Sequence, residues 1–217
     1  MEKKGKYKFI IWDWNGTIYD DTEFCVTIMN KLLSKRNLTL LTVENYKEVF
    51  DFPVKDYYQK LGFDFNEEPF EKVGTEFINE YNDKHFICKL HMGIDSLIKK
   101  LNKNGYDQFV LSAREETKLI EDIKHYGINN HFREVSGLNN HYANGKITIG
   151  KRLMKRNGII PKNCLLIGDT LHDAEVAAEL KVDCLLIANG HHSYNKLKQI
   201  DVPVFNSITE LENYLFR

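Results

Sequence analysis

Four short apolar runs stand out along the chain, each bounded by polar residues. They cover residues 7–12, 107–111, 164–167 and 182–187. Runs of this length without polar alternation are typical of strands that are buried on both faces. Stretches with helical spacing of apolar residues lie between them, at 93–104, 115–126, 148–157 and 171–180. Asn104-Gly105, Gly127 and Gly158 stand where left-handed caps would end three of these helices.

This alternation of strand and helix predicts an α/β fold. We expect a Rossmann-like parallel sheet with helices on both faces, and ligands gathering at the carboxyl ends of the strands. Between residues 22 and 85 the strands disappear and apolar residues recur every three to four positions. The sequence therefore predicts a core domain over 1–20 and 86–217, with an inserted all-helical domain over 21–85.

Local signals indicate where two helices of the insert begin. Asp20 with Glu23 resembles a helix-starting capping box, and Pro53 marks the start of a middle helix. Four aromatic residues of the insert are expected to pack between its helices, although they also suit a role in selecting the organic part of a substrate. These residues are Tyr57, Tyr58, Phe63 and Phe65.

Composition narrows the class of partner. With 217 residues, 42% apolar and 28% charged, the chain has ordinary globular values. The 30 Lys and Arg balance 31 Asp and Glu, so we expect neither nucleic acid nor membrane as a partner. One basic cluster is expected to be mostly the solvated face of a helix: Lys146, Lys151, Arg152, Lys155 and Arg156.

The cysteines indicate a reducing environment. Cys25, Cys88, Cys164 and Cys184 are widely spaced, with no Cys-x-x-Cys pair, which fits neither a zinc module nor a small disulfide framework. No apolar run approaches the length that spans a membrane. We therefore expect a cytoplasmic protein.

Carboxylates follow two of the predicted strands. Asp13 opens the segment Asp-Trp-Asn-Gly-Thr directly after the first strand, although Asn15-Gly16 between apolar residues is also a strong hairpin signal, and both interpretations stay open. Asp169 closes another strand, and Asp173 lies one helical turn further on, where an acid also suits an ordinary first turn. Asp13 and Asp169 together suit a hard divalent cation.

Two weaker signals lie between these carboxylates. Ser112, followed by Ala113, ends a strand with a hydroxyl that could instead cap the next helix. Lys151 stands in a predicted helix, where a solvated lysine is equally ordinary. The order of these features, with a helical insert after the first, resembles the haloacid dehalogenase superfamily with a cap of the first type. The resemblance covers essentially the whole chain.

The resemblance implies a phosphatase similar to phosphoglycolate phosphatases, in which Asp13 attacks phosphorus and forms an aspartyl-phosphate. It implies Mg²⁺ held by the Asp13 carboxylate, the Asn15 main-chain carbonyl and Asp169, with Asp173 supporting the metal and Lys151. It assigns the phosphoryl oxygens to Ser112, Ala113 and Lys151. The expected partner is a small phosphorylated metabolite, and the expected state is a monomer or weak homodimer.

The chain departs from this family at one position. Phosphatases of the family carry a second Asp two residues after the nucleophile as general acid and base, and here Asn15 stands there. An amide cannot transfer this proton, so turnover is expected to be slow, by roughly 10²- to 10⁴-fold, unless another acid substitutes. The alternative is a regulatory protein that binds a phospho-ligand, or is trapped as aspartyl-phosphate, without turnover.

Other features give weaker hypotheses. His191 and His192 follow Gly190 at a strand end and could touch substrate, but an exposed loop pair is expected, and the same holds for Arg114. Residues 145–152 nearly match the phosphate loop of nucleotide kinases. That reading is rejected because Arg152 stands where the loop needs a hydroxyl for Mg²⁺, and the loop would contain stiff β-branched residues.

Overall fold

The computed structural model describes residues 6–138 and 145–217. Its main sheet has six parallel strands in the order β5-β4-β1-β6-β7-β8. The strands are β1 (Phe9–Trp12), β4 (Asp107–Glu115), β5 (Glu134–Leu138), β6 (Cys164–Gly168), β7 (Asp183–Ile187) and β8 (Val204–Phe205). The predicted α/β fold is confirmed, and the four predicted strands all form; β5 and β8 were not predicted.

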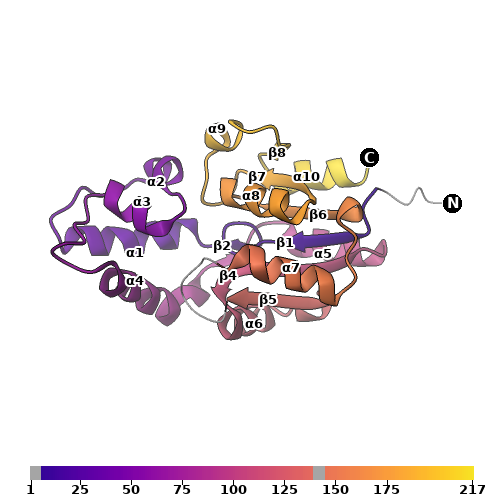
Figure 1. The fold of residues 1–217 in the computed structure, drawn as a ribbon, viewed down its shortest axis with the longest axis horizontal. Coiled ribbons are helices and arrows are strands. Elements are labelled where there is room, and N and C mark those ends of the chain that lie inside the picture. The colour runs from indigo at the N-terminus through magenta and orange to yellow at the C-terminus, as the bar shows by residue number, and fades with distance from the viewer. Residues whose placement is uncertain (1–5, 139–144) are drawn as a thin grey trace.

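Helices cover both faces of this sheet, as Figure 1 shows. They are α5 (Ile94–Lys103), α6 (Glu116–His125), α7 (Lys146–Arg156), α8 (Leu171–Leu180), α9 (Tyr194–Leu197) and α10 (Ile208–Leu215). Two single 3₁₀ turns, η2 (Asn129–His131) and η3 (Pro161–Asn163), precede β5 and β6. The left-handed glycines Gly105, Gly127 and Gly158 end α5, α6 and α7 as predicted.

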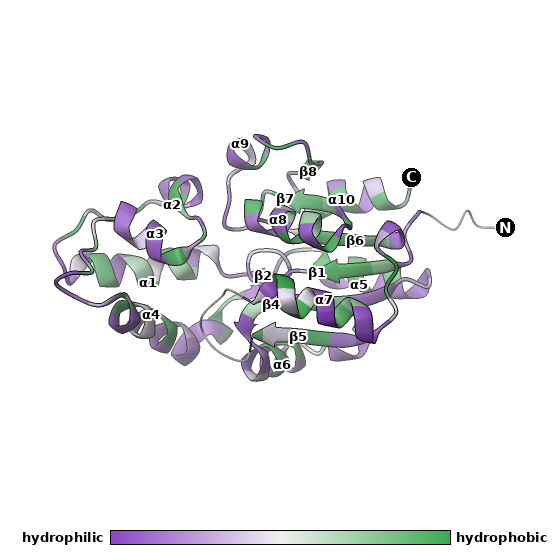
Figure 2. Ribbon diagram, viewed as in Figure 1, coloured by the Kyte–Doolittle hydropathy of each residue, from purple (hydrophilic) through white to green (hydrophobic). Residues whose placement is uncertain are grey.

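Successive side chains of β1 alternate between two apolar clusters. Ile10 and Trp12 belong to the cluster that includes α5, α6 and α10, whereas Phe9 and Ile11 pack with α7 and α8. A strand buried on both faces leaves no polar alternation in the sequence, which explains why its apolar run was a clear signal. Figure 2 shows the same concentration of hydrophobic residues in the strands.

The strands end in register at one edge of the sheet. Trp12 of β1 pairs with Val110 of β4 on one side and with Ile167 of β6 on the other. The residues that follow these positions in three parallel strands therefore meet at the carboxyl edge. Asp13, Ser112 and Asp169 are brought to this edge by the fold itself.

A helical segment is inserted between β2 (Tyr19–Asp20) and β3 (Lys89–Leu90), which pair antiparallel. Its elements are α1 (Thr22–Ser34), α2 (Val43–Val49), α3 (Val54–Lys60), α4 (Phe70–Lys84) and the 3₁₀ turn η1 (His85–Ile87). Figure 1 shows these helices grouped beyond the end of β1, on the side opposite the two chain termini. The segment is called the helical insert below.

The aromatic residues of the helical insert pack as expected. Tyr57, Tyr58 and Phe63 are buried, and the partly buried Phe65 packs against the same cluster. Pro53 directly precedes α3, as predicted. The predicted capping box is wrong: Asp21, not Asp20, is the residue before α1, and its side chain makes no capping bond because it is turned toward other partners.

The chain turns sharply after Asp13. The Trp14 carbonyl accepts the main-chain N–H groups of residues 17, 18 and 19, and Gly16 adopts a left-handed φ of 74°. The hairpin interpretation is therefore wrong in its main point, because the partners of β1 among the described residues are β4 and β6, and Tyr19–Asp20 pairs with β3. The Asn-Gly signal marks a tight turn that leads into the β2-β3 ribbon.

All four cysteines are free thiols. Among the residues that the structure describes, no helix combines the length and the apolarity needed to cross a bilayer.

Candidate active site

Asp13 is fixed by the strand that precedes it and by one lysine. Its main-chain N–H donates to the Ile167 carbonyl at 2.9 Å, which continues the β1-β6 ladder by one residue. Lys146 Nζ donates to Asp13 Oδ1 at 2.5 Å. The Asp13 side chain is 10% exposed and that of Lys146 only 5%, so this ion pair is nearly excluded from water.

Asp173 holds the same lysine from the other side. Lys146 Nζ lies 2.6 Å from Asp173 Oδ1. The second oxygen, Oδ2, accepts the main-chain N–H groups of Asp169 and Thr170 and the Thr170 hydroxyl. Thr170 and Asp173 form a reciprocal capping box at the start of α8. Asp173 is therefore both a helix-capping acid and a partner of the buried ammonium.

Asp169 completes a cluster of three carboxylates with Asp13 and Asp173. One oxygen from each of the three lies within 4.8 Å of the others. Asp169 accepts the Thr17 hydroxyl at 2.8 Å and the main-chain N–H of His191 at 2.6 Å. Asp169 has no exposed surface, and these bonds fix its orientation.

Two glycines permit this placement of Asp169. A Cβ atom added at Gly16 would lie 2.2 Å from Asp169 Oδ2, and one added at Gly190 would lie 2.1 Å from the same atom. Both distances are far below van der Waals contact. The carboxylate can occupy its position only because both neighbouring turns lack side chains.

Burial makes the acids costly to ionise. It raises the pKa of Asp13 to about 6, although Lys146 opposes the shift, and it raises the pKa of Asp169 to about 7. Burial also opposes ionisation of Asp173, but Lys146 and the Thr170 bonds outweigh it and lower the pKa of that carboxyl. One ammonium cannot neutralise three carboxylates, so the cluster favours a further cation.

The structure does not place Lys151 beside the carboxylates, where the sequence analysis predicted it. Lys146, which lay outside the predicted helix and had no predicted role, is there instead. Lys151 is 56% exposed and pairs with Glu179. The helix begins at Lys146, two residues before the predicted start. Five residues along a helix correspond to about 140° of rotation, so Lys146 and Lys151 cannot both face the carboxylates.

Ser112 lies at the end of β4 and is 1% exposed. Its hydroxyl accepts the main-chain N–H of Arg114 at 3.1 Å. It caps no helix, since α6 begins at Glu116 with Glu115 before it. The adjacent Ala113 is partly exposed at the same edge. Arg114 does not lie in an exposed loop, because its side chain is 7% exposed and its guanidinium pairs with Asp122.

Asn15 is turned toward the helical insert. Its side-chain N–H₂ group donates to Asp21 Oδ2 and to the Tyr81 hydroxyl, both at 2.7 Å. The Tyr81 hydroxyl donates to Asp21 Oδ2 at 2.8 Å, and the Gly16 N–H donates to Oδ1 at 3.0 Å. The carboxamide thus connects the turn after Asp13 to α4, in a network that the sequence did not predict.

His191 joins this network from the loop after β7. Its Nε2 lies 3.3 Å from Asp21 Oδ1, and its Nδ1 lies 3.0 Å from the Tyr46 hydroxyl in α2. Burial disfavours the imidazolium, but Asp21 outweighs it and raises the pKa of His191 to about 9. Burial likewise opposes ionisation of Asp21, yet His191 and the donated hydrogen bonds hold the pKa of Asp21 at about 2.

The expectation of an exposed histidine pair is wrong. His191 is 6% exposed and His192 has no exposed surface. His192 Nδ1 accepts the main-chain N–H of Leu171 at the start of α8. Burial first, and then Lys196, lower the pKa of His192 to about 4. The signal for the pair was present in the sequence, since both residues follow a glycine at a predicted strand end.

The loop after β7 and the following helix α9 bind the end of α2. Lys196 Nζ contacts the carbonyl oxygens of Phe50 and Glu48, and Asp51 Oδ2. In the reverse direction, Lys47 Nζ donates to the Asn189 carbonyl at 3.3 Å. The helical insert is therefore attached to the sheet domain directly beside the carboxylate cluster.

The chain matches a known protein family. The family model described as haloacid dehalogenase-like hydrolase matches residues 10–187, which is most of the chain. The chain belongs to the haloacid dehalogenase-like hydrolase family. The predicted resemblance and the assignment as a hydrolase are thereby confirmed.

Individual relatives of this haloacid dehalogenase-like chain are distant. It is 23% identical to a protein of Pseudomonas aeruginosa named 5'-nucleotidase, over 89% of this chain and 88% of the relative. It is 24% identical to phosphoglycolate phosphatase 1 of the same organism, over 85% of this chain and 71% of the relative. Both names denote phosphoric monoester hydrolases.

A solved structure extends the likeness of fold. Protein tyrosine kinase A of Mycobacterium tuberculosis superposes with a TM-score of 0.81 at 19% identity, covering 97% of this chain and 98% of the solved one. At this identity the likeness shows the haloacid dehalogenase-like fold alone.

Proposed function

We propose that the chain is a Mg²⁺-dependent phosphatase of a small phosphorylated metabolite and that Asp13 is its nucleophile. The observation that carries the proposal is the single buried ammonium of Lys146 between Asp13 and Asp173, beside Asp169. This arrangement lies at the carboxyl edge of a parallel sheet, where ligands bind in open α/β folds.

The donor set suits Mg²⁺. The three carboxylates offer only oxygen atoms, which hard cations prefer, and the raised pKa values of Asp13 and Asp169 express the cost of burying their charges together. Asp13, Asp169 and the main-chain carbonyl of Asn15 would hold the ion, with Asp173 supporting it. Bound there, Mg²⁺ supplies positive charge that offsets the repulsion between these acids and a phosphate dianion.

The residues divide the reaction as follows. A carboxylate oxygen of Asp13 attacks phosphorus, the bond from phosphorus to the ester oxygen breaks, and the leaving alkoxide takes a proton. Water then attacks phosphorus, which releases inorganic phosphate and regenerates Asp13. Lys146 keeps Asp13 ionised and counters the phosphoryl charge, and the Ser112 hydroxyl with the Ala113 main-chain N–H holds phosphoryl oxygens.

Asn15 sets the expected rate. Its amide is bound to Asp21 and Tyr81 and has no carboxyl proton to give. Without a positioned acid the proton for the leaving group comes from water, and turnover is slow by roughly 10²- to 10⁴-fold. The same observation favours a second candidate function, in which the protein binds a phospho-ligand or stays as aspartyl-phosphate and acts by regulation.

The helical insert is proposed to act as the cap domain that selects the organic part of the substrate. The relatives' names suggest two panels of compounds, phosphoglycolate-like acids and nucleoside monophosphates. A screen of both, with Mg²⁺ present and phosphate release as the readout, identifies the preferred class. We propose a phosphoglycolate-like metabolite.

The decisive experiment is Asp13→Asn, assayed by Mg²⁺-dependent phosphate release from p-nitrophenyl phosphate. We expect the variant to be inactive, while Asp183→Asn, a matched change at an ion pair with Lys6 remote from the site, keeps wild-type turnover. Wild-type turnover in Asp13→Asn would refute the nucleophile. Stoichiometric labelling of Asp13 by a radiolabelled phosphodonor without release would favour the regulatory function.

A further inference from the structure

A second cluster of ligand-type side chains lies beside the three carboxylates. Asp21, Cys25 and His191 each offer one atom within 4.8 Å of the other two, and all three side chains are buried. They differ from the first cluster in chemistry, because a thiol and an imidazole replace two carboxylates. The proposed phosphatase reaction uses neither of these two groups.

The fold brings these residues together from two separate segments. Asp21 directly precedes α1, and Cys25 follows one turn later, where its N–H donates to the Asp21 carbonyl at 2.9 Å. Residues four apart on a helix present their side chains on the same face. His191 approaches that face from the loop between β7 and α9. The cluster therefore joins the first helix of the insert to the sheet domain.

The separations of the ligand atoms fit one small cation. Cys25 Sγ lies 3.7 Å from Asp21 Oδ2, and His191 Nε2 lies 3.3 Å from Asp21 Oδ1. Ligands of a tetrahedral zinc site, with bonds of about 2.0 to 2.3 Å, lie about 3.3 to 3.5 Å apart. The two distances go to different oxygens of Asp21, and one atom from each residue lies within 4.8 Å of the other two. A rotation of the Asp21 carboxylate and side-chain shifts of about 1 Å would bring the three atoms around one cation, and a water molecule would complete the tetrahedron.

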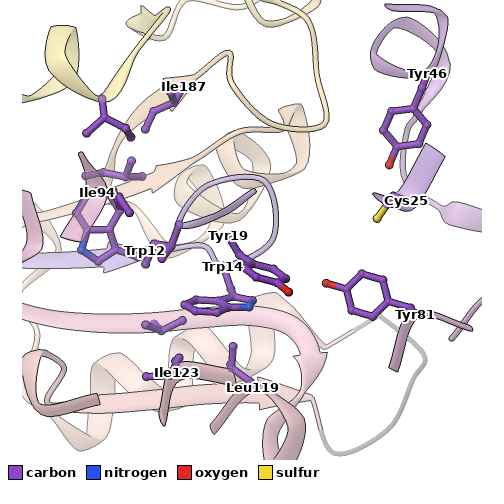
Figure 3. Packing of buried hydrophobic residues seen from close by; sticks show 14 of the residues in the cluster. Trp12, Trp14, Tyr19, Cys25, Tyr46, Tyr81, Ile94, Leu119, Ile123 and Ile187 are labelled. Carbon is purple, nitrogen blue, oxygen red and sulfur yellow. The ribbon is translucent and has the colours of Figure 1, made fainter. Parts of the chain in front are cut away.

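The surroundings orient two of the ligands. The Tyr46 hydroxyl engages His191 Nδ1, which leaves Nε2 directed at Asp21. Asn15, Gly16 and Tyr81 donate to the Asp21 carboxylate. Such outer hydrogen bonds on the second ring nitrogen and on the carboxylate are typical of metal ligands. Figure 3 shows Cys25, Tyr46 and Tyr81 directing their sulfur and hydroxyl groups toward a common space.

We propose that Asp21, Cys25 and His191 bind one thiophilic divalent cation of the zinc type, separate from the cation expected at Asp13 and Asp169. Thiolate and imidazole select zinc or cobalt over magnesium, whereas the all-carboxylate cluster selects magnesium. Binding replaces the Cys25 thiol proton and the proton that His191 shares with Asp21, and both protons leave to solvent. Before the cation binds, the site holds the ion pair of His191 with Asp21 and the protonated Cys25 thiol.

The consequence for the proposed reaction follows from Asp21. This carboxylate holds the Asn15 amide and the Gly16 N–H, which belong to the turn that carries the nucleophile. A cation bound to Asp21 makes the carboxylate a weaker acceptor for those donors, so the ion that fills the second site weakens the hold of Asp21 on the turn. Zinc is therefore expected to inhibit hydrolysis even when magnesium is saturating.

The test is a titration of the metal-free full chain with Co²⁺, followed by visible and near-ultraviolet absorption. We expect one equivalent to produce a thiolate-to-cobalt charge-transfer band that excess Mg²⁺ does not remove and Zn²⁺ does. Cys25→Ser must lose the band, and the matched variant Cys184→Ser must keep it. His191→Ala is expected to weaken Co²⁺ binding at least tenfold.

Two further measurements test this site independently of the proposed catalytic site. Asp13→Asn is expected to retain the cobalt-thiolate band, whatever its effect on hydrolysis, so the binding proposal stands or falls independently of the phosphatase. If Cys25→Ser does not fold, X-ray absorption on the zinc-loaded wild-type chain decides the matter. One sulfur neighbour at about 2.3 Å supports the site, and a first shell of nitrogen and oxygen alone overturns it.

Discussion

Lys146 Nζ bridges Asp13 and Asp173, at 2.5 Å from one carboxylate and 2.6 Å from the other. Burial would lower the pKa of this ammonium, but the two acids outweigh burial and raise it. A permanently charged lysine in a site closed to water holds the proposed nucleophile in its ionised form. The sequence-based prediction had assigned this role to Lys151.

Replacing this lysine tests its role directly. We expect Lys146→Met to reduce kcat by roughly 10²-fold or more, because the loss of one buried cationic donor at a phosphoryl group has this scale. The matched variant Lys151→Met is expected to stay within about twofold of wild type, since an exposed ion pair contributes little. Steady-state phosphate release measures kcat of both variants. A larger loss of kcat in Lys151→Met than in Lys146→Met would assign the catalytic role to Lys151.

The missing acid is tested by Asn15→Asp. We expect kcat to rise about tenfold or more, because a carboxyl group beside Asp21 retains a proton through mutual repulsion and can donate it to the leaving group. Asp21→Asn alone supplies no such group and serves as the control. Unchanged turnover in Asn15→Asp, together with a fast wild type, would mean that another residue already supplies the proton.

Magnesium should stabilise the folded chain. A ligand that binds only the native state at about 100 times its Kd adds about 2.7 kcal/mol, which corresponds to roughly 5 to 10 °C in Tm for a chain of this size. We expect this shift for wild type and for Asp183→Asn, and its loss in Asp169→Asn. Differential scanning fluorimetry with and without Mg²⁺ gives the readout; an undiminished shift in Asp169→Asn would exclude Asp169 as a ligand.

The His191–Asp21 pair predicts a pH-dependent stability. The folded-state pKa of His191, about 9, lies above its usual value of 6.5, so its contribution is complete below pH 6.5 and is lost as the pH rises through 9. Asp21 stays ionised throughout this range. The shift corresponds to about 3 kcal/mol as an upper figure.

Urea denaturation at pH 6 and pH 10 measures this contribution. We expect His191→Gln to lose more of its free energy of unfolding, relative to wild type, at pH 6 than at pH 10. His125→Gln, a change at an exposed histidine, serves as the control and should show no such difference. A gap between wild type and His191→Gln that is independent of pH would contradict the proposed charge pairing.

The sheet and its polar edge could be predicted because their causes are local in the sequence. Most of the buried strands appear as apolar runs, and the residue that ends such a run falls at the carboxyl edge whatever the rest of the chain does. Asp13, Ser112 and Asp169 needed no further information. β5, with the sequence Glu-Val-Ser-Gly-Leu, has no such run and was not predicted. β8 was not predicted because a strand of two residues, Val204 and Phe205, is too short to show a hydrophobic pattern.

The lysine could not be assigned in the same way. Its position depends on the first residue of α7, and a helix start is uncertain by a turn or more when no capping residue marks it. Gly145 precedes this helix without a side-chain cap. A shift of two residues in the expected start was enough to direct attention to Lys151 and to leave Lys146 outside the predicted helix.

The Asp21 network was invisible for another reason. Asp21, Tyr81 and His191 are separated by at least 60 residues in each pairing and meet only when the helical insert lies against the sheet domain. No periodic pattern encodes such a contact. The burial of His191 and His192 follows from the same packing, which converts an apparent surface loop into an interface.

Gly16 and Gly190 both border Asp169 Oδ2. This shared contact restricts which residues can change around the carboxylate cluster. Any side chain at either glycine would displace the Asp169 carboxylate, so neither glycine can be replaced without disturbing the carboxylate cluster. If the chain is the proposed phosphatase, a new substrate preference would therefore have to come from the aromatic residues of the helical insert, while the carboxylate cluster stays unchanged.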